Sequence, residues 1–108
     1  MLIHINSLDI ILKNGESMKF SKINGMQVVS SDAFLLGEIS GADVNTKHWS
    51  ITHLYVSLSD EAATKLGYKK PFLGHISICI PVLYVKTVGD VVTLSRTLQE
   101  LEKLPESD

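Results

Sequence analysis

The sequence predicts a small, mainly β domain with one short helix and a C-terminal helix. Residues 80–94 (IPVLYVKTVGDVVTL) hold two β-rich runs joined by a Gly-Asp turn. An earlier pair of β-rich runs lies within residues 25–39. Together the two pairs are typical of the opening and closing hairpins of one small β-barrel. The length of 108 residues fits one domain, so residues 1–108 are expected to share one core.

The first part of the chain predicts an N-terminal extra strand region, residues 1–20, before a barrel core at about 21–94. Asn14-Gly15 and Asn24-Gly25 are strong turn signals. Between them, Met18, Phe20 and Ile23 are expected to point inward. The extra region either adds an edge strand or builds a dimer contact.

Alternating apolar residues predict the strands of the core. The expected strands and extended segments are 26–30, 35–44, 51–58, 75–80, 82–85 and 88–94. Gly37 and Gly41 interrupt the second strand, which suggests bulges or tight bends. The third strand is expected to place Thr52, Leu54, Val56 and Leu58 on one face and Ile51, His53, Tyr55 and Ser57 on the other.

Two helices are expected, each from its end signals. Residues 59–67 begin at a cap, Ser59 or Asp60, and end at Gly67. Residues 97–104 begin with the capping box of Thr97 and Glu100. The leucines of this C-terminal helix share a face, which packs either on its own barrel or on another copy.

The residues with reactive side chains predict no catalytic or metal chemistry. The single cysteine, Cys79, lies in an apolar run, where a buried and inert thiol in a reducing cytoplasm is the expectation. The aspartates are expected at turns or caps, and the histidines show no metal-ligand spacing. They are Asp32, Asp43, Asp60 and Asp90, and His4, His48, His53 and His75. We therefore expect no enzyme activity, no cofactor and no metal site.

Composition points instead to a protein-binding role. The net charge of −2 argues against direct binding of nucleic acid, and a 44% hydrophobic content suggests that some apolar surface meets a partner. The N-terminus has no signal-peptide pattern, and no run is long enough to span a membrane. Trp49, in a predicted polar loop, is either a partner anchor or a flap over the barrel end. The candidate partner-binding residues are Trp49, Ile3, Ile5, Ile10 and Leu12.

Residues 21–94 resemble the PRC-barrel family. Residues 25–32 (GMQVVSSD) and 36–39 (LGEI) are similar to the family's opening pattern, G-x-x-V-x-S-x-D-G-x-x-x-G-x-V. Residues 80–92 (IPVLYVKTVGDVV) are similar to its closing pattern, v-P-x-x-x-V-x-x-V-G-D-x-v, and residues 50–56 fall at its central strand. The chain departs from the family at Ala33, where glycine is frequent, so a different hairpin turn is expected.

The resemblance implies a PRC-type β-barrel of about five to six strands. A stand-alone domain of this length is most similar to archaeal PRC-barrel proteins, some of which act in cell division. The implied role is a cytoplasmic, non-catalytic adaptor that forms a homodimer. Its implied partners at the division site are a SepF-like membrane anchor of the division ring or another PRC-barrel protein. The alternative is an RNA-processing or ribosome-assembly factor, by similarity to other family members.

Overall fold

The structure is a computed structural model, which describes residues 9–11, 17–69, 76–102, 104 and 106–107. Strands make up most of its regular structure, as predicted. The strands are β1 (Asp9–Ile11), β2 (Ser17–Lys19), β3 (Gln27–Val29), β4 (Leu35–Asn45), β5 (Ser50–Leu58), β6 (Ser77–Pro81), β7 (Val85–Val88), β8 (Val92–Leu94) and β9 (Glu106–Ser107). The helices are α1 (Phe20–Ile23), α2 (Asp60–Lys65), the 3₁₀ helix η2 (Val82–Tyr84) and α3 (Leu98–Leu101).

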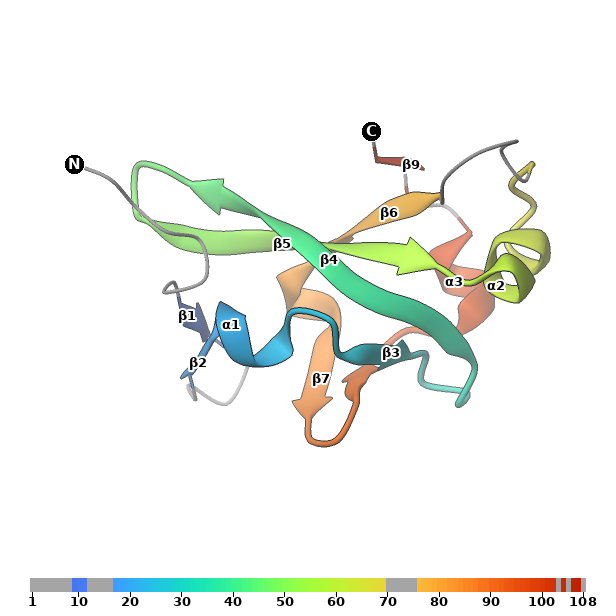
Figure 1. Cartoon of the computed structure of the whole chain (residues 1–108), viewed down its shortest axis with the longest axis horizontal. Helices are drawn as coiled ribbons and strands as arrows, with labels where there is room; N and C mark the ends of the chain where they lie inside the picture. The colour runs from blue at the N-terminus through green and yellow to red at the C-terminus, as the bar shows by residue number, and fades with distance from the viewer. Residues whose placement is uncertain (1–8, 12–16, 70–75, 103, 105, 108) are drawn as a thin grey trace.

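Seven strands form one mixed sheet in the order β7-β8-β3-β4-β5-β6-β9. The predicted opening hairpin, β3–β4, and closing hairpin, β7–β8, meet through a parallel ladder between β3 and β8. Figure 1 shows β4 and β5 as a long hairpin that runs across the molecule, with α2 and α3 near one end. The two hairpins predicted from the sequence are therefore neighbours in one sheet.

The expected closed barrel is not formed by the described residues. Their strand order ends at β7 on one side and β9 on the other, and no described ladder joins these two ends. Between β6 and β7 the chain makes the 3₁₀ turn η2, which starts directly after Pro81. Because proline fixes φ and lacks an N–H, it favours such a turn at the end of a ladder. The sheet formed by the described strands is therefore open.

The secondary structure of residues 82–94 also differs from the prediction. Residues 82–85 were expected to be extended, but Val82–Tyr84 form η2. The Gly-Asp turn expected between two β-rich runs is confirmed, because Gly89 and Asp90 lie between β7 and β8. The strand expected at 88–94 is shorter than predicted, since β8 covers only Val92–Leu94. Glycine and aspartate favour turns, so the Gly-Asp pair ends the first strand and starts the hairpin.

Two bulges shape the β4–β5 hairpin. On β4, Ser40 is the extra residue between the pairs Ile39–Val56 and Gly41–Tyr55. On β5, Thr52 is the extra residue between Ile51 and His53, which pair with the consecutive residues Val44 and Asp43. Each bulge reverses the facing of the residues beyond it. The glycine signals in β4 therefore did indicate an irregular strand.

The core lies on one face of this hairpin and of β6. Leu54, Val56 and Leu58 are buried, as predicted, and the buried isoleucines of β6 continue the same face. Ile51 was expected on the opposite face, but it is also buried. The bulge at Thr52 is the reason, because it brings Ile51 back to the inner side.

The connection between β3 and β4 is organised by buried Ser30. The amide of Phe34 donates to Ser30 Oγ at 3.0 Å, and this hydroxyl donates to Asp32 Oδ1. Ala33 has φ +66, the left-handed conformation that glycine favours. The turn therefore has at Ala33 the backbone conformation that glycine favours, although the residue is not glycine.

The two predicted helices are present but shorter than expected. Ser59 Oγ accepts from the amide of Ala62 at the start of α2, and Gly67 follows its end with φ +85. The predicted capping box of α3 is confirmed, since Thr97 and Glu100 exchange both of its hydrogen bonds. Leu101 is fully buried, and the α3 leucines pack on this chain's own core.

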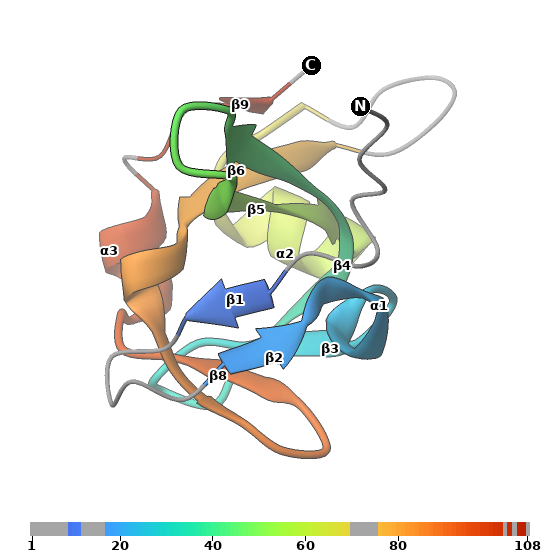
Figure 2. The same ribbon diagram turned by 90° about the vertical axis from the view of Figure 1, so that its left-hand side faces the viewer.

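The N-terminal residues form a separate two-stranded sheet. β1 pairs antiparallel with β2, with Ile10 opposite Met18, and α1 follows β2 directly. Figure 2 shows this hairpin beside α1. Phe20 and Ile23 are buried as predicted, while the Met18 side chain and the Asn14-Gly15 turn lie outside the described part. The described part of the predicted extra strand pairs with β2 and not with the seven-stranded sheet.

Candidate functional site

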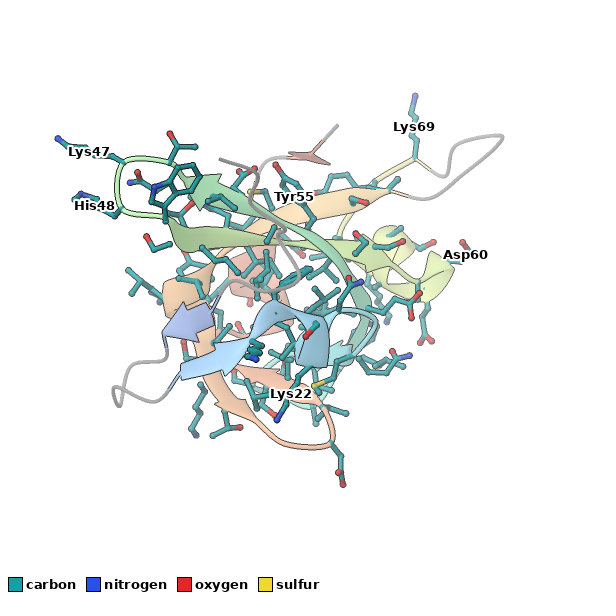
Figure 3. All side chains as sticks on the ribbon, turned by 60° about the vertical axis from the view of Figure 1, so that its left-hand side comes forward. Lys22, Lys47, His48, Tyr55, Asp60 and Lys69 are labelled. Atoms are coloured by element: carbon teal, nitrogen blue, oxygen red, sulfur yellow. The ribbon has the colours of Figure 1, made fainter. Side chains whose placement is uncertain are left out.

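The outer face of β4, β5 and β6 carries a group of reactive side chains. It consists of Asp43, His53, Tyr55 and Cys79, which we call the polar cluster. All four side chains are partly buried. Figure 3 shows Tyr55 among these strands, on the side away from α1.

Strand register brings these residues together from three separate parts of the sequence. Asp43 is the direct partner of His53, and Tyr55 is the direct partner of Cys79. Direct partners in an antiparallel pair point to the same face. The bulge at Ser40 is essential, because unbroken alternation from buried Ile39 would place Asp43 on the inner face.

Gly41 makes room for the aromatic member of the cluster. It is the direct partner of Tyr55, and a Cβ at this glycine would lie 3.0 Å from Tyr55 Cδ2. That distance is tighter than ordinary carbon contacts. The missing side chain at Gly41 therefore lets the tyrosine ring lie across β4, where its hydroxyl reaches Asp43.

Asp43 connects the cluster through both of its carboxylate oxygens. The Tyr55 hydroxyl donates to Oδ1, and the Cys79 thiol lies 3.9 Å from Oδ2. The hydrogen bond to Asp43 raises the pKa of Tyr55 to about 12, with burial adding to the shift. Burial, followed by the charge of Asp43, raises the pKa of the Cys79 thiol. Both groups are therefore protonated around neutral pH.

His53 lies at the edge of the same cluster. Its Nδ1 is 3.0 Å from Thr52 Oγ1, the hydroxyl of the bulge residue. One ligand atom from each of Asp43, His53 and Cys79 lies within 4.8 Å of the other two. Sequence spacing offered no signal for this convergence, and Asp43, expected at a turn or cap, lies inside β4. Only the register and the two bulges reveal it.

The tip of the β4–β5 hairpin presents the candidate anchor Trp49. This side chain is 46% exposed, and its backbone has φ +52, an uncommon conformation for a bulky residue. The amide of Lys47 donates to Asn45 Oδ1 at 2.9 Å, and this hydrogen bond stabilises the turn that precedes Trp49. Figure 3 shows Lys47 and His48 projecting away from the body at this tip.

The structure places the other candidate partner-binding residues only in part. Ile10 belongs to β1, which contacts β5, the strand that follows Trp49. Ile3, Ile5 and Leu12 lie outside the described residues. Two exposed large apolar side chains were not singled out from the sequence: Leu35 at 49% and Leu83 at 70% exposed. Both leucines lie in apolar segments that were expected to be extended, so nothing in the sequence singled them out.

A pocket of about 410 Å³ lies near the start of β4, and none of its lining residues belongs to the polar cluster. It is lined by Gln27, Leu35, Gly37, Glu38, Ser57, Leu58 and Ser59. These side chains include no histidine, cysteine or cation. The polar cluster therefore offers more side chains that can bind a metal ion or react than this pocket does.

Comparisons with known proteins do not identify a family for this chain. A scan against protein-family models and a search of curated proteins each found no match to this chain. Within the described residues, no helix has the length and apolar character needed to cross a membrane.

Proposed function

We propose that this chain is a non-catalytic protein-binding scaffold that contacts its partner through the tip of the β4–β5 hairpin. The observation that carries the proposal is the half-exposed Trp49 at that tip. Tryptophan is enriched among residues that dominate protein–protein binding energy, because it offers a large and rigid contact surface. Exposure of such a side chain on a hairpin tip is a poor arrangement for core stability and a good one for docking.

The backbone of Trp49 supports the same reading. A left-handed conformation costs an L-residue roughly 1–2 kcal/mol, and glycine would adopt it without strain. Unfavourable backbone conformations of this kind gather at functional sites. A tryptophan kept at φ +52 is therefore better explained by what its side chain binds than by the turn that it occupies.

The proposed partners follow from the resemblance to PRC-barrel proteins. We propose a cytoplasmic adaptor of archaeal cell division, located at the division site. Its partner would be a SepF-like membrane anchor of the division ring or another PRC-barrel protein. Trp49→Gly is the direct test, because glycine fits φ +52 and the substitution removes the whole side chain without straining the backbone. Loss of partner capture with an intact fold is the expected result.

The same proposal includes a homodimer. The described sheet ends at β7 and β9, and open sheet edges favour pairing with another chain. Two-fold pairing of identical edges is the simplest symmetric solution. Sedimentation equilibrium should therefore give a mass about twice the 11.9 kDa of the chain. A strictly monomeric mass at high micromolar concentration would contradict the dimer but not the partner contact of Trp49.

A further inference from the structure

We propose that Asp43, His53 and Cys79 form a three-ligand site for a zinc-type divalent metal ion. Their ligand atoms lie within 4.8 Å of one another on one face of three adjacent strands. A thiolate, an imidazole and a carboxylate are the three side-chain ligands that Zn²⁺ uses in proteins, and the Cys79 thiol would release its proton to solvent when the metal binds. This mixture favours zinc over calcium or magnesium, which prefer oxygen ligands alone.

The spacing already approaches the geometry that zinc requires. Zn–S and Zn–O bonds of about 2.3 and 2.0 Å at a tetrahedral angle place sulfur and oxygen about 3.5 Å apart. Cys79 Sγ and Asp43 Oδ2 are 3.9 Å apart. The remaining ligand-atom separations are at most 4.8 Å, so metal binding would require them to shorten by no more than about 1.5 Å.

The surroundings supply outer hydrogen bonds that orient the ligands. The Tyr55 hydroxyl donates to Asp43 Oδ1, which leaves Oδ2 facing the thiol. Thr52 Oγ1 is 3.0 Å from His53 Nδ1, and when Nδ1–H donates to it, the lone pair of Nε2 is available to the metal. Such outer partners fix ligand orientation in metal sites. The fourth tetrahedral position is left for water or an external ligand.

Titration of the purified chain with Co²⁺, a spectroscopic substitute for Zn²⁺, tests the site. We expect one equivalent to bind with visible d–d bands and a thiolate-to-cobalt charge-transfer band, and Zn²⁺ to displace it. Cys79→Ser should remove the charge-transfer band. His53→Gln and Asp43→Asn should weaken binding by more than the roughly 10–100-fold typical of outer-sphere partners, and Tyr55→Phe by about 10-fold.

His48→Gln is the matched control. His48 is an exposed histidine in the same hairpin, and it is not a member of the ligand set. This variant should bind Co²⁺ as the wild type does. If His48→Gln weakens binding as much as His53→Gln, or if Cys79→Ser leaves the spectrum unchanged, the proposed ligand set is wrong.

Thiol protection tests the site without any substitution. Cys79 is the chain's single cysteine and is partly exposed, so an alkylating reagent can report on it alone. Saturating Zn²⁺ should slow its alkylation at least about tenfold, because a coordinated thiolate is shielded. An unchanged rate with excess Zn²⁺, together with no saturable Co²⁺ binding, would overturn the proposal and leave the cluster as a hydrogen-bond network.

Discussion

Gly37 shows how strongly one residue can constrain the packing of the β4–β5 hairpin. A Cβ at this position would lie 1.9 Å from the carbonyl oxygen of Ser57, which belongs to the neighbouring strand. The clash is with backbone, so no side-chain rotation relieves it. The strand pair can approach so closely only because position 37 has no side chain.

Gly37→Ala should therefore destabilise the protein by at least about 3 kcal/mol, the upper end of typical overpacking costs. Gly89→Ala is the control, because a Cβ at Gly89 meets no atom within 4 Å. Chemical denaturation of the three proteins measures the difference. Equal midpoints for the two variants would show that β4 and β5 do not approach as described.

Asp32 is a second residue with a specific structural role. Its carboxylate accepts from Ser30 Oγ and, at 3.2 Å, from the amide of Leu98 at the start of α3. The Ser30 hydrogen bond is the main reason that the pKa of Asp32 lies below its ordinary value of 3.8. A lowered folded-state pKa means that the unfolded chain takes up the proton first as the pH falls.

The stability contributed by Asp32 should thus be complete above about pH 4 and should be lost as the pH falls from there through the lowered pKa. Asp32→Asn should show a smaller loss of unfolding free energy on acidification than the wild type. Unfolding curves at several pH values from neutral to strongly acidic would show it. Parallel pH profiles for the two proteins would mean that Asp32 does not act in this way.

At the scale of elements, α3 depends on its cap more than on its length. It has only four residues, Leu98–Leu101, yet it carries the fully buried Leu101. Isolated helices of this length are not stable in water, so the cap and the buried leucine must hold it. Arg96 adds a contact over the ring of Tyr84, 4.6 Å from its centroid.

Thr97→Ala should cost about 1 kcal/mol of unfolding free energy, because it removes the side-chain oxygen that accepts from the Glu100 amide. Gln99→Ala, at an exposed position of the same helix, should change stability by less than about 0.5 kcal/mol. Thermal and urea denaturation measure both values. A cost for Gln99→Ala equal to that for Thr97→Ala would rule out the cap as the cause.

The elements also show what local sequence patterns can and cannot predict. Strands β4, β5 and β6, the cap of α2 and the capping box of α3 follow from alternation and end signals, which act within a few residues. The bulges at Ser40 and Thr52 do not, because their positions depend on how two strands align. For this reason the facing of Ile51 was predicted wrongly.

The polar cluster was invisible in the sequence for the same reason. His53 and Tyr55 were correctly placed on the strand face opposite the core, whereas Cys79 was expected to be buried and is only partly buried. Nothing local in the sequence relates these three residues to Asp43. The bulge at Ser40 turns the following residues of β4 to the opposite face of the sheet, and the pairing of β5 with β6 brings Cys79 beside Tyr55. Together they create the site. Trp49, by contrast, could be selected from the sequence, because a tryptophan in a polar loop is unusual.

For the whole molecule, the main difference from expectation is the open sheet. The opening and closing hairpins do pair, through β3 and β8, but within the described residues β7 and β9 remain at opposite ends of the strand order. Closure depends on long-range pairing that local patterns do not specify. An open sheet with a half-exposed tryptophan on its longest hairpin suits a protein that completes its contacts with other chains.

The most direct measurement is partner capture by the tagged protein from native extract of its source cells, with mass spectrometry of the bound proteins. Wild type is compared with Trp49→Gly and with Leu83→Ala, which removes another exposed apolar side chain. Circular dichroism checks that all three are folded. Wild type and Leu83→Ala should recover the anchor protein of the division ring, and Trp49→Gly should not. Recovery of ribosomal proteins or RNA instead, or equal capture by Trp49→Gly, would contradict it.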